Sequence, residues 1–177
     1  AVADEEETLV LKMMLDMGTR PGELAALTPS DINWDYSSGD IGATVKIDKT
    51  YSQGNGVIDS PKTEDSIRTV NLRNDTVELL KEFIDENDIG DDELMFNSYR
   101  YVYNMIKDVF SFAWVKIGSD MITDYSPHNL RHQTITRLIV EEDYPKEKVQ
   151  RYVGHSSVEI TEIYEHFKED QVVDIYA

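Results

Sequence analysis

Six side chains of this sequence have the types and the order of a site that could transfer a phosphodiester through a tyrosine. Guanidinium groups can donate paired hydrogen bonds to phosphate oxygens, and imidazoles can move protons near neutral pH. A phenol can attack phosphorus and form a covalent intermediate. The groups are spread over most of the chain, so the fold must bring them together. The six candidates are Arg20, Lys62, His128, Arg131, His155 and Tyr164.

Three of the predicted helices begin at or near a candidate cation. Arg20 directly precedes Pro21, and proline is favoured in the first turn of a helix. His128 and Arg131 fall in the first turn of a second predicted helix, and His155 comes just before a third. A positive side chain at this end opposes the helix dipole by about 0.3–1 kcal/mol, but the free N–H groups there bind phosphate. The repetition indicates a shared anionic target.

Hydrophobic periodicity predicts an α+β chain that is predominantly α-helical. A group of short segments between the helices predicts a small antiparallel sheet. At 177 residues the chain is long enough to bury a core of its own, and one domain covering 1–177 is expected. Helices are predicted at 5–17, 21–27, 75–88, 101–117, 127–142, 146–152 and 158–167, and strands at 41–47, 50–51, 57–58 and 67–72.

A site that handles phosphate would be expected to bind nucleic acid, but the net charge of −18 argues against such a partner. A protein that binds nucleic acid usually carries a basic surface. Two acidic runs, at 4–7 and 85–93, are interpreted as solvated surface rather than as a metal site, and the second is predicted to be a loop. Net charge does not fix the potential of one concave face. It does predict that this chain alone binds DNA weakly and with a strong dependence on salt.

The sequence contains no cysteine, which excludes disulfides and thiolate metal sites and favours a reducing cytoplasm. No apolar run approaches the roughly 18–20 residues of a membrane span, and no signal peptide opens the sequence. The short acidic start, at 1–7, is the kind expected of a fragment cut from a longer protein.

Each candidate also has a simpler interpretation. An isolated histidine and arginine three residues apart, as His128 and Arg131 are, usually form an ordinary pair on a helix surface. His128, His132 and His155 could instead bind zinc, but no HExxH general base accompanies their spacing, so phosphate is favoured over metal. A lone lysine in a turn, such as Lys62, is usually just solvated.

Tyr164 is one of ten tyrosines, and most tyrosines lie in cores or interfaces. It differs from the others because it follows His155 by nine residues, on the predicted helix after a Gly-His turn. Arg68 is a competing cation from the same predicted hairpin as Lys62, and it is interpreted as a structural residue.

The chain carries, in order, the motifs Gly18-Thr-Arg20-Pro-Gly-Glu23, Pro61-Lys62-Thr-Glu-Asp-Ser-Ile-Arg68, His128-Asn-Leu-Arg131-His132 and Gly154-His155, followed by Tyr164. Together these resemble the catalytic domain of the tyrosine recombinase (phage integrase) family. Any one motif is weak evidence, but five features in order and correctly spaced are specific. The resemblance extends from about Thr8 to Phe167. It implies a mostly α-helical catalytic domain with a small three-stranded antiparallel sheet, and chemistry without a metal or other cofactor.

The resemblance also implies a role for each candidate. Tyr164 would attack a DNA phosphorus, leaving a 3′-phosphotyrosine and a free 5′-hydroxyl. This linkage stores the energy of the broken bond, so joining to another strand needs no ATP. Arg20 and Arg131 would hold the non-bridging oxygens and stabilise the charge of the transition state. Lys62 would protonate the leaving 5′-oxygen.

His128 would act as general base towards the tyrosine, whose ordinary pKa of about 10 keeps it mostly neutral at pH 7. His155 would donate a hydrogen bond to the phosphate. Glu23, three residues after Arg20, would orient that arginine. On sequence grounds Glu23 could equally be a carboxylate on the helix surface.

The function implied by the resemblance is site-specific recombination of double-stranded DNA by the integrase of a phage or other mobile element. The reaction would take place in the cytoplasm of a bacterial or phage-infected cell. The N-terminal core-binding and arm-binding domains of such enzymes are expected to be absent from 1–177. Three alternatives stay open: strand relaxation like that of a type IB topoisomerase, a non-catalytic DNA-binding or assembly module, and a metal-dependent hydrolase.

The resemblance further implies a homo-oligomer, a tetramer on DNA, in which the C-terminal segment packs onto a neighbouring copy. The alternative is that this segment frays, as chain ends commonly do. The residues that give it an apolar face are Val172, Val173, Ile175 and Tyr176.

Overall fold

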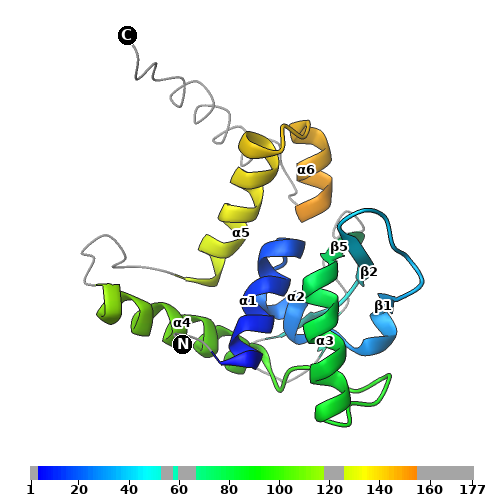
Figure 1. Ribbon diagram of the computed structural model, residues 1–177, viewed down its shortest axis with the longest axis vertical. Coiled ribbons are helices and arrows are strands. Elements are labelled where there is room, and N and C mark those ends of the chain that lie inside the picture. The colour runs from blue at the N-terminus through cyan, green and yellow to red at the C-terminus, as the bar shows by residue number, and fades with distance from the viewer. Residues whose placement is uncertain (1–3, 53–57, 60–66, 118–125, 155–177) are drawn as a thin grey trace.

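The computed structural model describes residues 4–52, 58–59, 67–117 and 126–154. Figure 1 shows α1 near the middle of the molecule and α3 to its right. The helices α5 and α6 lie beyond the C-terminal end of α1. The helices are α1 Glu5–Met17, α2 Pro21–Ala25, α3 Asn74–Glu86, α4 Tyr99–Ile117, α5 Pro127–Thr136 and α6 Lys146–Val153, with a short 3₁₀ turn η1 at Pro29–Asp31.

The helix α1 has strong sequence signals at both ends. The Glu7 amide donates to Asp4 Oδ1 and the Asp4 amide donates to Glu7 Oε2, each at 2.8 Å, which caps the N-terminus. Gly18 ends the helix with a φ of 59°, a left-handed conformation that glycine adopts readily. A Cβ at this position would also lie 3.1 Å from both Thr134 Cγ2 and Val153 Cγ1. The end of α1 is therefore closely packed against α5 and α6.

The main sheet is antiparallel and has the strand order β1-β2-β5, formed by Ile32–Asn33, Ile41–Ile47 and Arg68–Arg73. A separate two-stranded sheet is formed by β3 Thr50–Tyr51 and β4 Ile58–Asp59. The prediction that β3 and β4 share one sheet with β2 and β5 is therefore wrong. The third strand is β1, and two residues are too few to show an alternating pattern. The predicted fold class, predominantly helical with a small three-stranded antiparallel sheet, is confirmed.

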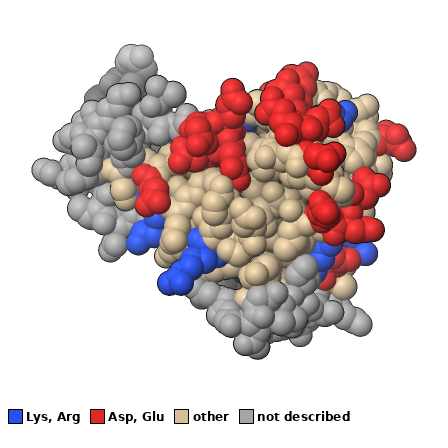
Figure 2. Space-filling view, turned by 90° about the horizontal axis from the view of Figure 1, so that it is seen from below, with Lys and Arg blue, Asp and Glu red and all other residues tan. Residues whose placement is uncertain are grey.

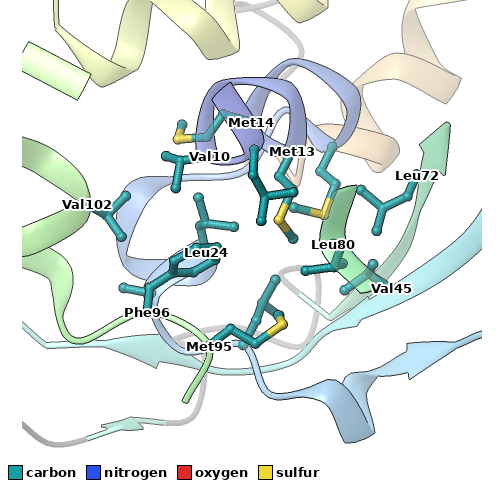
Figure 3. Packing of buried hydrophobic residues seen from close by; sticks show 14 of the residues in the cluster. Val10, Met13, Met14, Leu24, Val45, Leu72, Leu80, Met95, Phe96 and Val102 are labelled. Carbon is teal, nitrogen blue, oxygen red and sulfur yellow. The ribbon is translucent and has the colours of Figure 1, made fainter. Parts of the chain in front are cut away.

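The largest core lies between α1, the main sheet, α3 and α4 (Figure 3). Val45 of β2 and Val70 of β5 are paired in register, and both are fully buried. Phe96 stacks on Phe83 of α3 with ring centroids 5.7 Å apart. Leu24, from the five-residue α2, is also fully buried in this cluster. The short helix that follows Arg20 is thus held by the central core.

The predicted helix at 127–142 is found as two consecutive pieces. α5 is followed directly by a π-helical turn, η3, at Arg137–Glu141. The predicted helix at 158–167 lies outside the described residues. None of the helices in the described part of the chain is long and apolar enough to cross a membrane. A second, smaller cluster joins α5, η3 and α6 through Ile135, Ile139, Val149 and Val153.

Acidic side chains gather over the upper and right-hand parts of the face shown in Figure 2, whereas basic side chains are fewer and lie mainly in its lower half. Glu5, Glu6 and Glu7 occupy the first turn of α1, where negative charge is favoured by the helix dipole. The second acidic run is only partly a loop, because α3 continues to Glu86. Part of the acidity therefore has a local structural role at the start of α1.

Candidate active site

Arg20 lies at the N-terminus of α2, where its main chain and its side chain bind one carboxylate. The Arg20 amide donates to Glu23 Oε2 at 2.8 Å, and its Nη1 donates to Glu23 Oε1 at 2.9 Å. The Arg20 side chain is 43% exposed, whereas that of Glu23 is 7% exposed. Glu23 is therefore a buried group that fixes the direction of a guanidinium still in contact with solvent. It is not an ordinary helix-surface carboxylate.

A second arginine, Arg68 of β5, binds the same carboxylate. Its Nη2 donates to Glu23 Oε2 at 2.8 Å and its Nη1 to Oε1 at 3.2 Å, which is the paired geometry that favours arginine over lysine. Burial alone would raise the pKa of Glu23. The hydrogen bonds and positive charge of Arg68, aided by those of Arg20, outweigh burial and hold this pKa below its ordinary value. Glu23 is therefore ionised at neutral pH.

The same two arginines bind the C-terminal end of α6. Arg68 Nε donates to the Tyr152 carbonyl at 2.8 Å, and Arg20 Nη2 donates to the Gly154 carbonyl at 3.3 Å. Cations are favoured at this end of a helix, where the last carbonyls have no partner within the helix. Gly154 has a φ of 67°, and a Cβ there would lie 3.0 Å from Arg68 Nη1. Any other residue would be strained by this backbone conformation and would press on the Arg68 guanidinium, and His155 is the next residue in the sequence.

Arg131 approaches from α5 and is 4% exposed. Its Nη1 donates to the Gly18 carbonyl at 2.5 Å, two residues before Arg20 in the chain. One turn later on α5, Thr134 Oγ1 donates to the Leu15 carbonyl at 2.8 Å. These bonds fix α5 along the end of α1. Arg131 is consequently held against the short segment that carries Arg20.

His128 is exposed in the first turn of α5, three residues before Arg131, so the two share one side of the helix. The pKa of the neighbouring His132 is lowered by partial burial and by the charges of His128 and Arg131. Among residues 4–52, 58–59, 67–117 and 126–154, no three His, Asp or Glu side chains are grouped to hold a metal ion. The zinc alternative includes His155, which lies outside these ranges.

Tyr152 has a structural role that was not predicted from the sequence. Its hydroxyl accepts a hydrogen bond from the Asn71 amide at 3.1 Å and donates one to the Asp16 carbonyl at 2.9 Å. Burial raises its pKa to about 12, so the hydroxyl keeps its proton. The side chain joins α6 to β5 and α1. The sequence signal for this role was the position of Tyr152, in the last turn of a predicted helix and two residues before Gly154.

In the described part of the site, Glu23 binds Arg20, Arg131 binds the Gly18 carbonyl two residues before Arg20, and His128 lies one turn from Arg131. Arg68 is a buried structural cation, as predicted. Two guanidinium groups held by one short segment, one of them partly exposed, can bind an anion with two non-bridging oxygens. The candidates outside the described residues are Lys62, His155 and Tyr164.

The ionised Glu23 is expected to stabilise the fold in a pH-dependent way. Its pKa is lower in the folded chain than its ordinary value of 4.5, so its contribution is fully present above that value. The contribution is lost as the pH falls through the lowered pKa. Glu23→Gln should reduce the free energy of unfolding by about 1–3 kcal/mol at neutral pH, and the difference should shrink in acid. Urea denaturation at a series of pH values measures it.

Glu82→Gln is the matched control, because Glu82 is exposed on α3. Its substitution should change the free energy of unfolding little at any pH. A Glu23→Gln difference that stays constant from neutral to acidic pH would contradict the depressed pKa.

The fold just described is that of tyrosine recombinase catalytic domains. The chain is similar to the Tn1549 transposon integrase in complex with a circular intermediate DNA, with a TM-score of 0.71 and 19% identity over 89% of this chain and 52% of that chain. It is also similar to the crystal structure of XerA recombinase, with a TM-score of 0.67 and 23% identity over 92% of this chain and 52% of that one.

The family model described as the phage integrase family matches residues 2–171, and the chain belongs to this family. A probable integrase of prophage ps2 from Lactococcus lactis subsp. lactis is 28% identical to it over 94% of this chain and 47% of the relative. Tyrosine recombinase XerA from Saccharolobus solfataricus is 24% identical over 97% of this chain and 49% of the relative. The chain therefore spans about half the length of these relatives.

Proposed function

We propose that the chain is the catalytic part of a site-specific tyrosine recombinase, which cleaves and rejoins DNA through a 3′-phosphotyrosine, and that it acts in the integrase of a phage or other mobile element. The observation that carries the proposal is the position of Arg131, which donates to the Gly18 carbonyl two residues before Arg20, together with the partly exposed guanidinium of Arg20. The prophage and transposon integrases among its similar proteins support the assignment to a mobile element.

In the proposed reaction the Tyr164 oxygen forms a bond to a DNA phosphorus while the bond from phosphorus to the 5′-oxygen breaks. His128 takes the tyrosine proton, and Lys62 gives a proton to the leaving oxygen, so the step is balanced. Arg20 and Arg131 bind the non-bridging oxygens, where negative charge increases in the transition state. His155 would donate a further hydrogen bond to the phosphate. Attack by a 5′-hydroxyl on the phosphotyrosine reverses the step and rejoins a strand.

The proposed substrate is double-stranded DNA. The Tn1549 integrase and the XerH recombinase to which this chain is similar were each solved in complex with DNA. Although the net charge is −18, the candidate site holds Arg20 and Arg68 on one carboxylate, and Arg131 on the Gly18 carbonyl nearby in the chain. Its local charge is therefore opposite in sign to that of the whole chain, and the local charge governs contact with a phosphate.

The test is a nicked suicide DNA substrate, from which the short fragment that carries the free 5′-hydroxyl diffuses away, so that the covalent intermediate is trapped. We expect an adduct of the chain with DNA, and digestion followed by mass spectrometry should locate it in the peptide that contains Tyr164. An adduct at another tyrosine would contradict the site. Absence of any adduct, with DNA still bound, would favour the non-catalytic module.

Two further readouts separate the remaining alternatives. Relaxation of supercoiled DNA without joining to a partner site would favour topoisomerase-like activity. Loss of cleavage with a chelator would favour a metal-dependent hydrolase, and we expect no effect.

The number of chains in the trapped complex, measured by native mass spectrometry, tests the proposed tetramer held by the C-terminal segment. The proposed reaction would take place in the cytoplasm of a bacterial or phage-infected cell.

A further inference from the structure

Arg68 connects three parts of the candidate site that come from distant parts of the chain. Its guanidinium uses Nη1 and Nη2 on Glu23 and Nε on the Tyr152 carbonyl. Its carbon atoms lie against Gly154, where an added Cβ would meet Cδ and Cζ at 3.3 Å. The side chain is 4% exposed, so it is unlike Arg20 in having little access to a substrate.

The charges around Glu23 explain why a second arginine matters. Each Glu23 oxygen accepts from both arginines: Oε1 from Nη1 of Arg20 and of Arg68, and Oε2 from the Arg20 amide and Arg68 Nη2. Two guanidinium groups and one carboxylate leave one positive charge. With Arg68 absent, Glu23 and Arg20 would form a neutral pair, and the exposed guanidinium would stabilise less strongly the negative charge that increases on the phosphate in the transition state.

Arg68 also holds the end of α6 in place. The Tyr152 carbonyl is in the last turn of α6 and accepts from Arg68, while the Gly154 carbonyl accepts from Arg20. One carboxylate thus aligns two cations that both bind the same helix end. Movement of Arg68 would loosen Arg20 and the Gly154 turn together.

We propose that Arg68 is a positioning residue for strand cleavage: it compensates the charge of Glu23, so that Arg20 keeps a net positive charge for the phosphate, and it fixes the end of α6 beside Arg20. This inference rests on the proposed function. Arg68 itself does not touch the substrate. Its effect is expected on the rate of cleavage rather than on the affinity for DNA.

The experiment measures single-turnover cleavage of the suicide substrate and DNA affinity for the 177-residue chain. Arg68→Met should slow cleavage by about tenfold to hundredfold, the loss typical of residues that orient a reacting group, with DNA affinity nearly unchanged. Adding Glu23→Gln should restore part of the lost rate, because Arg20 then regains its uncompensated charge. In the otherwise unchanged chain, Glu23→Gln should instead slow cleavage, because it frees Arg20 to move.

Arg73→Lys is the matched control, since Arg73 lies on the same strand, is half exposed, and pairs with Asp16 and Glu142 rather than with the site. It should cleave at the unchanged rate. A thermal melting curve of each variant establishes that it is folded at the assay temperature. The double variant replaces a buried ion pair by neutral groups, a change that proteins often tolerate.

Unchanged cleavage by Arg68→Met would overturn the inference. So would a double variant in which the two losses simply multiply, because the charge of Glu23 would then have no part in the loss caused by Arg68→Met. If the chain with no substitution forms no adduct, the proposed function fails and this inference fails with it. An adduct from that chain together with full activity of Arg68→Met rejects the inference alone.

Discussion

Replacement of Arg131 by lysine is expected to slow strand cleavage by about 10²- to 10³-fold, the loss typical when one preorganised donor to a transition-state oxygen is removed. The Arg131 guanidinium is buried and gives Nη1 to the Gly18 carbonyl. A guanidinium can hold this carbonyl and still direct other N–H groups elsewhere in its plane. A lysine ammonium is a compact charge on a flexible chain and cannot reproduce that geometry. Single-turnover cleavage of the suicide substrate measures the effect.

Arg137→Lys provides the matched control for this substitution. Arg137 follows α5 directly and also binds the end of α1, because its Nη2 donates to the Leu15 carbonyl at 3.1 Å. If Arg131 acts only by fastening α5 to α1, the two lysine variants should lose cleavage equally. If it binds the phosphate, Arg137→Lys should cleave at close to the unchanged rate. Equal losses would therefore contradict the role proposed for Arg131.

Elements with strong local signals were predicted with the observed bounds. The helix Glu5–Met17 has a capping box at one end and a left-handed glycine at the other. The strand Ile41–Ile47 has its ends where they were predicted. Both elements also contribute fully buried side chains to the main core. Local signals and long-range packing agree at these elements, which is why the sequence was sufficient.

Elements defined by their partners were not predicted. Strand β1, Ile32–Asn33, exists because it pairs with Val45 and Thr44 of β2, and no pattern in two residues reveals a partner. The π-helical turn at Arg137–Glu141 could not be distinguished from a continued α-helix, because both place apolar side chains on similar faces. Such features follow from tertiary contacts that sequence spacing does not contain.

The site shows the same division. The motif order indicated Arg20 and Arg131, whose types suit phosphate, but it left Glu23 undecided between orientation and surface. Burial of Glu23 depends on Arg68, which lies 45 residues later in the chain. The position of Arg20 at a helix start did not reveal its second partner, since its Nη2 donates to the Gly154 carbonyl just past the end of α6. A cation there is stabilised by the dipole of α6 while it stands at the start of α2.

Leu24→Ala is expected to lower the free energy of unfolding by about 2–5 kcal/mol, the range observed when a buried leucine leaves a cavity. Leu24 is fully buried in the main core (Figure 3). It belongs to a helix of five residues, and helices this short have little stability of their own in water. The position of α2, and with it that of Arg20 and Glu23, therefore depends on this side chain. Urea denaturation measures the change.

Leu11→Ala tests whether the effect is specific to burial, because Leu11 is only partly buried at the edge of the same core. It should cost less than half as much as Leu24→Ala, since less apolar area returns to water. At temperatures where both variants are folded, the loss of α2 packing should also slow cleavage more in Leu24→Ala. Equal costs for the two leucines would mean that α2 is held chiefly by its hydrogen bonds. The Glu23 network, rather than the core, would then determine where Arg20 lies.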